Sequence, residues 1–309
     1  MNKLFRMVSL SLALLLALTA LPVLAEGITL TDMAGREVSL PAPARKIVVL
    51  AAADAEILYA IGAGDRVVGR GEYANYPEAV LVVPAVQSGN ETNIEQIIAL
   101  APDLVVMPTM AQQVEQVEQM EKAGIPVLAT DAKDIAGTYA AIRLLGEATG
   151  LVQEADAVVR SMEEGFAALK ALAAEQELEG SVYFEVSPLQ WGLWTAGKGT
   201  FMDEIAALLG LTNAFEDVDG WKEVSQEQVL ARDPDYIVTV AMYFGEGPTP
   251  VEEITGRDGW QDLKAVKEQH VLLLDNDQIS RPGPRLLDAA ESLYQLVTQS
   301  SPTQEAPAA

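Results

Sequence analysis

The stretch Asn93-Ile-Glu-Gln-Ile-Ile-Ala-Leu-Ala-Pro-Asp-Leu-Val-Val106 recurs 132 residues later as Ser225-Gln-Glu-Gln-Val-Leu-Ala-Arg-Asp-Pro-Asp-Tyr-Ile-Val238. In each copy a polar residue, Asn93 or Ser225, stands three positions before a Gln, which is the spacing of a capping box at the start of a helix. A Pro-Asp turn and an apolar strand follow in both copies. One helix–turn–strand unit that occurs twice predicts two structurally related lobes, and a cleft between lobes is a usual place for a ligand.

Apolar strands alternate with helices on both sides of a long helical stretch. Strands are predicted over residues 46–50, 67–69, 103–107, 126–128, 181–185, 236–240 and 271–274. Such strands, separated by helices, are typical of a parallel sheet that is covered on both faces. The helical stretch from 134 to 177 is interrupted only at Thr149-Gly150. We therefore predict an α/β fold of two doubly wound α/β lobes joined by one long α-helix, with a ligand cleft between the lobes.

The alternation of strands and helices also predicts where the two lobes and the bridging helix begin and end. The N-terminal lobe is expected over residues 27–150, the bridging helix over 151–178 and the C-terminal lobe over 179–299. Residues 300–309 are polar and are expected to form a disordered tail. Because a single long helix bridges the lobes, we expect only a small hinge motion when a ligand binds.

Residues 1–25 have the pattern of a secretory signal peptide. Lys3 and Arg6 precede an apolar run over residues 7–21, and the segment ends on a small residue, Ala25. We predict cleavage near Ala25, and the alternative is an uncleaved membrane anchor, because the run is nearly long enough to span a bilayer. No cysteine follows the run, which excludes a lipid-anchored lipoprotein. The mature chain is therefore expected outside the cytoplasm, in the periplasm or at the cell surface.

The composition narrows the possible chemistry. The sequence of 309 residues contains no cysteine and one histidine, and its formal net charge is −25. The lack of cysteine excludes a disulfide scaffold, a cysteine-ligated metal site and a thiol nucleophile. The single histidine, His270, is expected at the surface, and a nucleic-acid partner is excluded because phosphate binding needs clustered Lys and Arg. We expect a monomer with no catalytic residue, no resident metal and no cofactor.

Several further motifs carry a resemblance to a known family. They are Thr31-Asp-Met-Ala-Gly-Arg36, Ala55-Glu-Ile-Leu58, Gly64-Asp-Arg-Val-Val-Gly69, Tyr73-Ala-Asn-Tyr-Pro77, both copies of the repeat, Thr195-Ala-Gly-Lys-Gly-Thr-Phe201, Gly220-Trp-Lys-Glu-Val-Ser225 and Arg281-Pro-Gly-Pro-Arg285. With these motifs in this order, the chain resembles the extracytoplasmic substrate-binding proteins of ATP-driven (ABC) importers for vitamin B12, ferric siderophores and haem. The resemblance covers nearly all of the mature chain. It implies a metal chelate as the ligand and a permease in the membrane as the partner.

The resemblance also implies a role for two residues of the repeat, Glu95 and Glu227. One carboxylate per lobe would dock onto arginines of the permease. A carboxylate in the first turn of a helix is held by the positive end of the helix dipole. The alternative is that each Glu only stabilises its own helix, by roughly 0.3–1 kcal/mol. The recurrence of Glu at the same register in both lobes favours docking.

Aromatic residues are the candidates for ligand contact. Tyr73 and Trp221 match positions that pack against the corrin ring in vitamin B12-binding members, and Trp194 lies where another cleft aromatic is found. Large flat ligands bind such faces through area burial and stacking. The alternative is that each aromatic side chain belongs to the core of its own lobe.

The chain departs from the vitamin B12 pattern at two positions. Gly89 stands where a tryptophan is expected, and Gln278, which we retain as a ligand contact, stands where a second aromatic residue is expected. Lys198 and Arg281 are candidates to pair with an anionic chelate, although solvation at the rim or a structural ion pair would explain them equally. Cobalamin is slightly favoured as the ligand, with ferric siderophore or haem close behind.

An extracytoplasmic hydrolase that uses cleft carboxylates is the alternative function. The pairs Glu163-Glu164 and Glu252-Glu253 suggest it, since glycosidases use two carboxylates. Adjacent acids on a helix point away from each other, however, so both pairs are expected on the solvated surface. We therefore expect a binding protein and not an enzyme.

Overall fold

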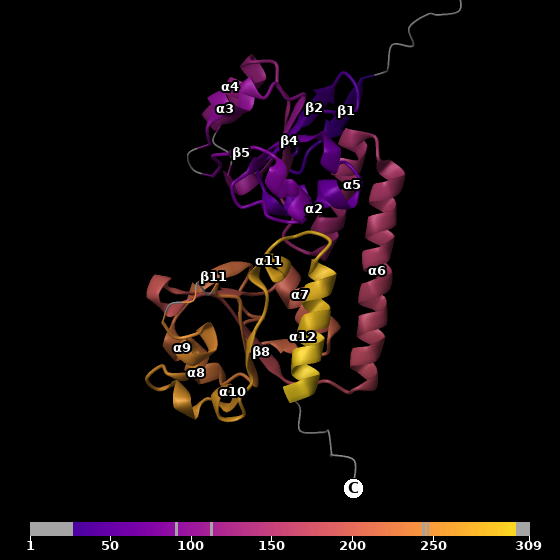
Figure 1. Ribbon diagram of the computed structural model, residues 1–309. Helices are drawn as coiled ribbons and strands as arrows, with labels where there is room; N and C mark the ends of the chain where they lie inside the picture. Colours follow the sequence, from indigo (N-terminus) through magenta and orange to yellow (C-terminus); the bar gives the residue numbers. More distant parts are fainter. Residues whose placement is uncertain (1–26, 90–91, 112–113, 243–244, 246, 301–309) are drawn as a thin grey trace, which may run out of the picture.

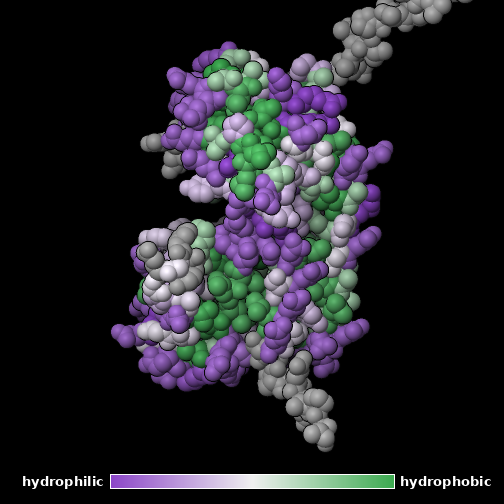
Figure 2. Space-filling model, in the orientation of Figure 1, coloured by the Kyte–Doolittle hydropathy of each residue, from purple (hydrophilic) through white to green (hydrophobic). Residues whose placement is uncertain are grey.

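The computed structural model describes residues 27–89, 92–111, 114–242, 245 and 247–300. The predicted signal peptide and residues 301–309 of the predicted tail lie outside these ranges, whereas Ser300 is the last residue of a helix. Two lobes lie one above the other and are joined along one side by helix α6 (Val152–Glu175) (Figure 1). α6 falls inside the range 151–178 expected for the bridging helix. On the side away from α6, the surface is notched between the lobes (Figure 2).

The N-terminal lobe contains a parallel five-stranded sheet with the order β5-β4-β3-β6-β7. A separate antiparallel hairpin of β1 and β2 precedes it. The elements are β1 (Ile28–Thr31), β2 (Glu37–Leu40), β3 (Ile47–Val49), α2 (Ala52–Ala60), η1 (Gly64–Arg66), β4 (Val67–Gly71), η2 (Glu78–Val82), β5 (Ala85–Val86), α3 (Ile94–Ala99), β6 (Leu104–Pro108), η3 (Thr109–Ala111), α4 (Val114–Lys122), β7 (Val127–Thr130) and α5 (Ile135–Thr149). Gly150 ends α5 in the left-handed conformation, at φ 72°, which glycine adopts without strain.

The C-terminal lobe contains a six-stranded sheet with the order β11-β9-β8-β12-β13, and β10 also pairs with β8. The elements are β8 (Ser181–Ser187), η4 (Leu189–Trp191), β9 (Leu193–Ala196), α7 (Phe201–Leu208), β10 (Thr212–Asn213), β11 (Trp221–Val224), α8 (Gln226–Arg232), β12 (Tyr236–Thr239), α9 (Pro250–Thr255), η5 (Trp260–Asp262), α10 (Lys264–Lys267), β13 (Val271–Leu273), α11 (Asn276–Ile279) and α12 (Leu286–Ser300). β9 and β11 are antiparallel to their neighbours, so this sheet is mixed. The sequence predicts the parallel strands β8, β12 and β13 but not these two.

The two copies of the repeat fold as equivalent units, with one difference. Ser225 and Gln228 form a full capping box at the start of α8. At the start of α3, Asn93 accepts the hydrogen bond from the Gln96 backbone N–H, but the Gln96 side chain accepts one from the Gln87 backbone N–H instead of completing the box. The capping box predicted for the first copy is therefore wrong, because the backbone N–H of Gln87, just after β5, captures the Gln96 side chain.

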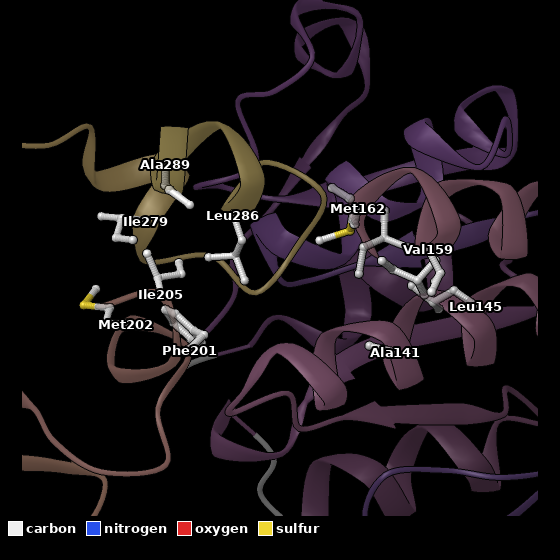
Figure 3. Close-up of a cluster of buried hydrophobic side chains, with 14 of the residues drawn as sticks. Ala141, Leu145, Val159, Met162, Phe201, Met202, Ile205, Ile279, Leu286 and Ala289 are labelled. Atoms are coloured by element: carbon white, nitrogen blue, oxygen red, sulfur yellow. The ribbon is translucent and has the colours of Figure 1, made fainter. Parts of the chain in front are cut away.

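The hydrophobic core runs from one lobe into the other. Alternate strand residues face opposite sides, so Val49 and Phe184 join one shared cluster, whereas Val48 and Tyr183 join clusters confined to their own lobes. Figure 3 shows the shared cluster where α5 and α6 lie near α7, α11 and α12, with Ala141, Leu145, Val159, Met162, Phe201, Met202, Ile205, Ile279, Leu286 and Ala289 labelled. The lobes are thus joined by packing as well as by α6.

The two sheets point their carboxyl ends at each other. β8 starts at the far end of the C-terminal lobe, where α6 ends, and runs back toward the N-terminal lobe (Figure 1). β12 and β13 are parallel to β8 and end on the same side. Beyond β7, the Lys133 carbonyl accepts a hydrogen bond from the Phe201 backbone N–H at 3.0 Å, which places this end of the N-terminal sheet against the other lobe. Ligands of α/β sheets bind outside such carboxyl ends.

Candidate functional site

A pocket of about 540 Å³ lies at the carboxyl ends of β8 and β12. Its apolar wall includes Trp191, Met242 and three prolines, Pro188, Pro248 and Pro250. The side chains of Trp191 and Met242 are 73% and 63% exposed, which is unusual for large apolar groups and leaves them free to contact a ligand. An adjacent pocket of about 450 Å³ shares Met242 and extends to α11.

The polar wall of the larger pocket is a buried ion-pair cluster. Arg257 donates two hydrogen bonds to Glu185, at 2.7 and 2.8 Å, and two to Glu253, at 3.0 and 2.5 Å. The side chains of Glu185 and Arg257 are almost fully buried, whereas that of Glu253 is 35% exposed. Burial alone would lower the pKa of the Arg257 guanidinium, but its hydrogen bonds with the two carboxylates raise that pKa above its ordinary value. The guanidinium of Arg257 therefore stays charged and fixes the two acidic side chains beside the pocket.

The same arginine connects the pocket to α8. The guanidinium of Arg257 lies 4.4 Å from the centre of the Trp260 ring, and Trp260 is fully buried. The Trp260 indole N–H donates to the Gln226 side chain at 3.1 Å. Gln226 directly precedes Glu227, so the pocket wall and the first turn of α8 are parts of one packed unit.

The N-terminal lobe contributes a small polar group at the facing edge of its sheet. The Thr109 hydroxyl donates to Asp131 at 2.7 Å, and Lys133 forms an ion pair with the same carboxylate at 2.8 Å. Asp54, in the first turn of α2, accepts a hydrogen bond from Thr130. Burial raises the pKa of Asp54 to about 7, against the opposite effect of that hydrogen bond.

A polar junction between the lobes lies beside the cleft. Glu56 of α2 accepts hydrogen bonds from Arg285, at 2.6 and 2.8 Å, and from Arg281, at 2.9 Å. Arg281 also bonds Asn75 and Asp277, and Asn75 in turn donates to Asp277. The Glu56 side chain is 2% exposed, and both arginines are 13% exposed. These residues come from both lobes, so the junction holds the lobes at one separation.

The variant Glu56→Gln is expected to lower the free energy of unfolding by about 2–3 kcal/mol. Its amide would present N–H donors to two guanidinium groups that now share a buried carboxylate. Urea unfolding measures the change. The control is Glu118→Gln, which removes an exposed ion pair with Lys122 and should change stability by less than about 0.5 kcal/mol. Equal losses in the two variants would contradict this account of the junction.

The shared core and this junction also predict a stiff hinge. Small-angle scattering with and without bound chelate is expected to give the same radius of gyration within error. A clear compaction on binding would show that the junction opens in solution. The Glu56→Gln protein serves as the comparison, because a weakened junction permits a larger change.

The structure places the predicted ligand contacts on both lobes. Tyr73 is 78% exposed and lies on the N-terminal lobe, while Trp194 on β9 is 40% exposed. Trp221 is half-buried, with its ring 5.3 Å from that of Phe201, so its packing supports the alternative of a core residue. Lys198 is exposed and Gln278 half-buried. Among the described residues that line the two pockets, none of these side chains is found.

Arg281 belongs to the junction. Its guanidinium bonds Glu56, Asn75 and Asp277, which is the structural ion pair that the sequence left open as an alternative. The prediction that it contacts a ligand therefore gains no support. All three partners precede Arg281 in sequence, and Glu56 is 225 residues away.

Two further sequence interpretations are corrected. Glu253 is not a solvated surface residue, because it lines the larger pocket and bonds Arg257, whereas its neighbour Glu252 is exposed. His270 is buried, 7% exposed, with its ring stacked on Tyr236 at 4.9 Å. The Tyr236 ring that covers His270 comes from another element, β12. Arg257 is only four residues after Glu253, but its second partner, Glu185, is 72 residues away from it in sequence.

Sequence reasoning missed the residues that line the pocket, above all Trp191, Met242 and Glu185. A signal was present, because each follows or ends a predicted strand, and the residues after parallel strands form the binding edge of an α/β sheet. Trp191 comes four residues after β8, and Met242 comes three residues after β12.

Glu95 and Glu227 occupy equivalent places. Both are exposed in the first turn of a short helix, α3 or α8, which lie in different lobes on the side away from α6 (Figure 1). Ile97 and Val229, again 132 residues apart, are fully buried and anchor the two helices. A hydrogen bond from the Ser225 side chain lowers the pKa of Glu227, so this carboxylate is charged at neutral pH.

Comparison with known proteins matches the chain to one kind of protein, the substrate-binding protein. The family described as "Periplasmic binding protein" matches residues 47–278. An uncharacterised substrate-binding lipoprotein of an ABC transporter from Bacillus subtilis is 36% identical over 275 residues, 87% of this chain and 85% of its own length. The vitamin B12-binding protein of Salmonella paratyphi A is 31% identical over 83% of this chain and 91% of its own.

A solved structure shares the architecture. The periplasmic haem-binding protein of Roseiflexus in its apo form has a TM-score of 0.74 and 26% identity, and the match covers 83% of this chain and 98% of that chain. These relatives are named as binding proteins and not as enzymes, so they do not favour the hydrolase alternative. Within the described residues, no helix combines the length and the apolar character needed to cross a membrane.

Proposed function

Because this chain belongs to the periplasmic binding protein family, we propose that it captures a metal chelate outside the cytoplasm and delivers it to the permease of an ABC importer. The observation that carries the proposal is the pocket at the carboxyl ends of β8 and β12, which lies where two facing sheets leave room for a ligand. The chain has the two lobes, the long connecting helix and the notch that such capture requires.

Cobalamin is the first candidate for the ligand, and ferric siderophore and haem are the others. Vitamin B12-binding relatives match more than four fifths of the chain, which supports this order. Trp191 and Met242 offer an exposed apolar wall for a large flat ligand. The metal arrives inside the chelate as part of the substrate, and the protein itself holds no cofactor.

Delivery rests on Glu95 and Glu227. One carboxylate on each lobe would orient the protein over two equivalent halves of a permease. In this proposal the protein acts as a monomer, exported with residues 1–25 as its signal peptide. The exposed positions of both side chains support a docking role.

Absorbance tests the capture step. The purified mature chain is incubated with cyanocobalamin, haem or a ferric siderophore, separated from free chelate and scanned for the bound chromophore. We expect one of the three to be retained in equal molar amount. Retention of none, together with turnover of a glycoside or ester, would support the hydrolase alternative instead.

The variant Trp191→Ala is expected to weaken chelate binding by about tenfold or more, because it removes the largest exposed apolar face of the pocket. Isothermal titration measures the affinity. The matched control is Val82→Ala, an exposed apolar residue that lines neither pocket. An unchanged affinity in Trp191→Ala would place the ligand elsewhere.

A further inference from the structure

The charged side chains that line the two pockets are all acidic in the described part of the chain. Among the described residues that line them, the charged side chains are all carboxylates: Glu185 and Glu253 in the larger pocket, and Asp275 and Asp277 in the adjacent one. The larger pocket is also partly closed by apolar groups, and such surroundings strengthen the field of any unbalanced charge. The sign of that charge therefore bears on which chelates can enter.

The guanidinium groups packed beside these pockets are already matched by carboxylates. Arg257 bonds both Glu185 and Glu253, so one positive charge faces two negative charges. Arg281 bonds Asp277 and Glu56. Lys198, which the sequence offered as a partner for an anionic ligand, is exposed and lies outside both linings.

Two of the four carboxylates retain room to accept further hydrogen bonds. Each carboxylate oxygen has two acceptor sites, and Arg257 uses one site on each oxygen of Glu253, whose side chain is 35% exposed. Asp275 is exposed, and one of its oxygens accepts a hydrogen bond from the Gln278 backbone N–H. An N–H group of a ligand would form a charge-assisted hydrogen bond with either residue.

We propose that this site selects a chelate whose pocket-facing edge is uncharged or cationic and carries N–H donors, such as primary amides or an ammonium group. A carboxylate on that edge meets like charge in a partly buried place and is rejected. The inference rests on the proposed capture of a chelate and adds the chemical class of the face that the protein recognises.

A series of chelates that differ in one terminal group tests the selection. Ferrioxamine B carries an ammonium group, its N-acetyl derivative is neutral there, and its N-succinyl derivative carries a carboxylate. A second pair is cyanocobalamin and the monocarboxylic acid obtained by hydrolysing one of its amides. In whichever series binds, we expect the carboxylate member to bind at least tenfold more weakly than the cationic or amide member.

Variants identify the residues responsible. Asp275→Asn removes a charge but keeps an N-cap side chain for α11, and Glu253→Gln leaves Arg257 paired with Glu185. Each is expected to reduce the discrimination at least threefold by improving binding of the carboxylate member. The control is Glu216→Gln, an exposed residue outside both linings, which should leave the ratio unchanged. Thermal unfolding verifies that each variant is folded.

The outcomes separate the inference from the proposed function. If the carboxylate member binds as tightly as its partner, or if both variants keep the wild-type ratio, the selection is overturned while chelate capture stands. If only haem is retained, whose edge carries two carboxylates, the selection is overturned while chelate capture stands. If neither series nor haem binds, chelate capture itself fails, and the inference fails with it.

Discussion

The variant Arg257→Met is expected to lose about 3–5 kcal/mol of unfolding free energy, because it leaves Glu185 buried without a counter-charge. Burial already raises the pKa of Glu185 against the opposing effect of Arg257. Without the guanidinium, the folded protein would bind a proton at this carboxyl more tightly than the unfolded chain does. Stability of the variant should therefore fall as the pH rises, so the loss is larger at pH 7.5 than at pH 5. Urea unfolding at both pH values measures it.

The control for this variant is Arg143→Met, which removes an exposed ion pair with Asp156. It should cost less than about 1 kcal/mol at either pH. A loss in Arg257→Met that is equally small, or that does not grow with pH, would mean that the carboxylates beside the pocket are solvated and not fixed.

The double variant Glu95→Ala, Glu227→Ala is expected to reduce chelate uptake by at least about thirtyfold while leaving chelate affinity unchanged. Each substitution removes a charged contact that we propose with the permease, and a charge pair at an interface is worth about 2 kcal/mol or more. Uptake is measured in cells that carry only the variant, and affinity is measured on the purified protein.

A double variant of two other exposed carboxylates, Glu118→Ala and Glu216→Ala, removes the same charge from the same two lobes and should leave uptake intact. A collapse of chelate affinity in the Glu95, Glu227 variant would instead place those residues in the ligand site. Normal uptake would remove them from the docking surface.

The repeat predicted the parts of the fold that depend on local pattern. Ile97 and Val229 are buried at the same register because each faces the lobe-specific side of its own sheet. The parallel strands were predictable for the same reason, since a strand covered on both faces is apolar throughout. β9 and β11 include exposed and polar residues, as in Leu193-Trp-Thr-Ala196, and are not apolar throughout, so they gave a weaker signal.

The site was harder to predict, because contacts between distant residues decide it. Nothing near Arg281 in the sequence shows that Glu56 lies against it, and nothing near Glu253 shows that Arg257 joins it to Glu185. The rule that adjacent acids point apart was correct for Glu252 and Glu253. It could not show that the second of them points at a buried arginine.

Anomalous X-ray diffraction tests the central claim most directly, because cobalt or iron in a bound chelate marks its own position. Crystals of the mature chain with the chelate that it retains should give one metal peak between the lobes, on the side of Trp191 and Met242. A peak in the separate pocket of about 480 Å³ between α2, α6 and α12, beside Tyr59 and Leu287, would contradict this account. So would a peak on the outer surface of either lobe.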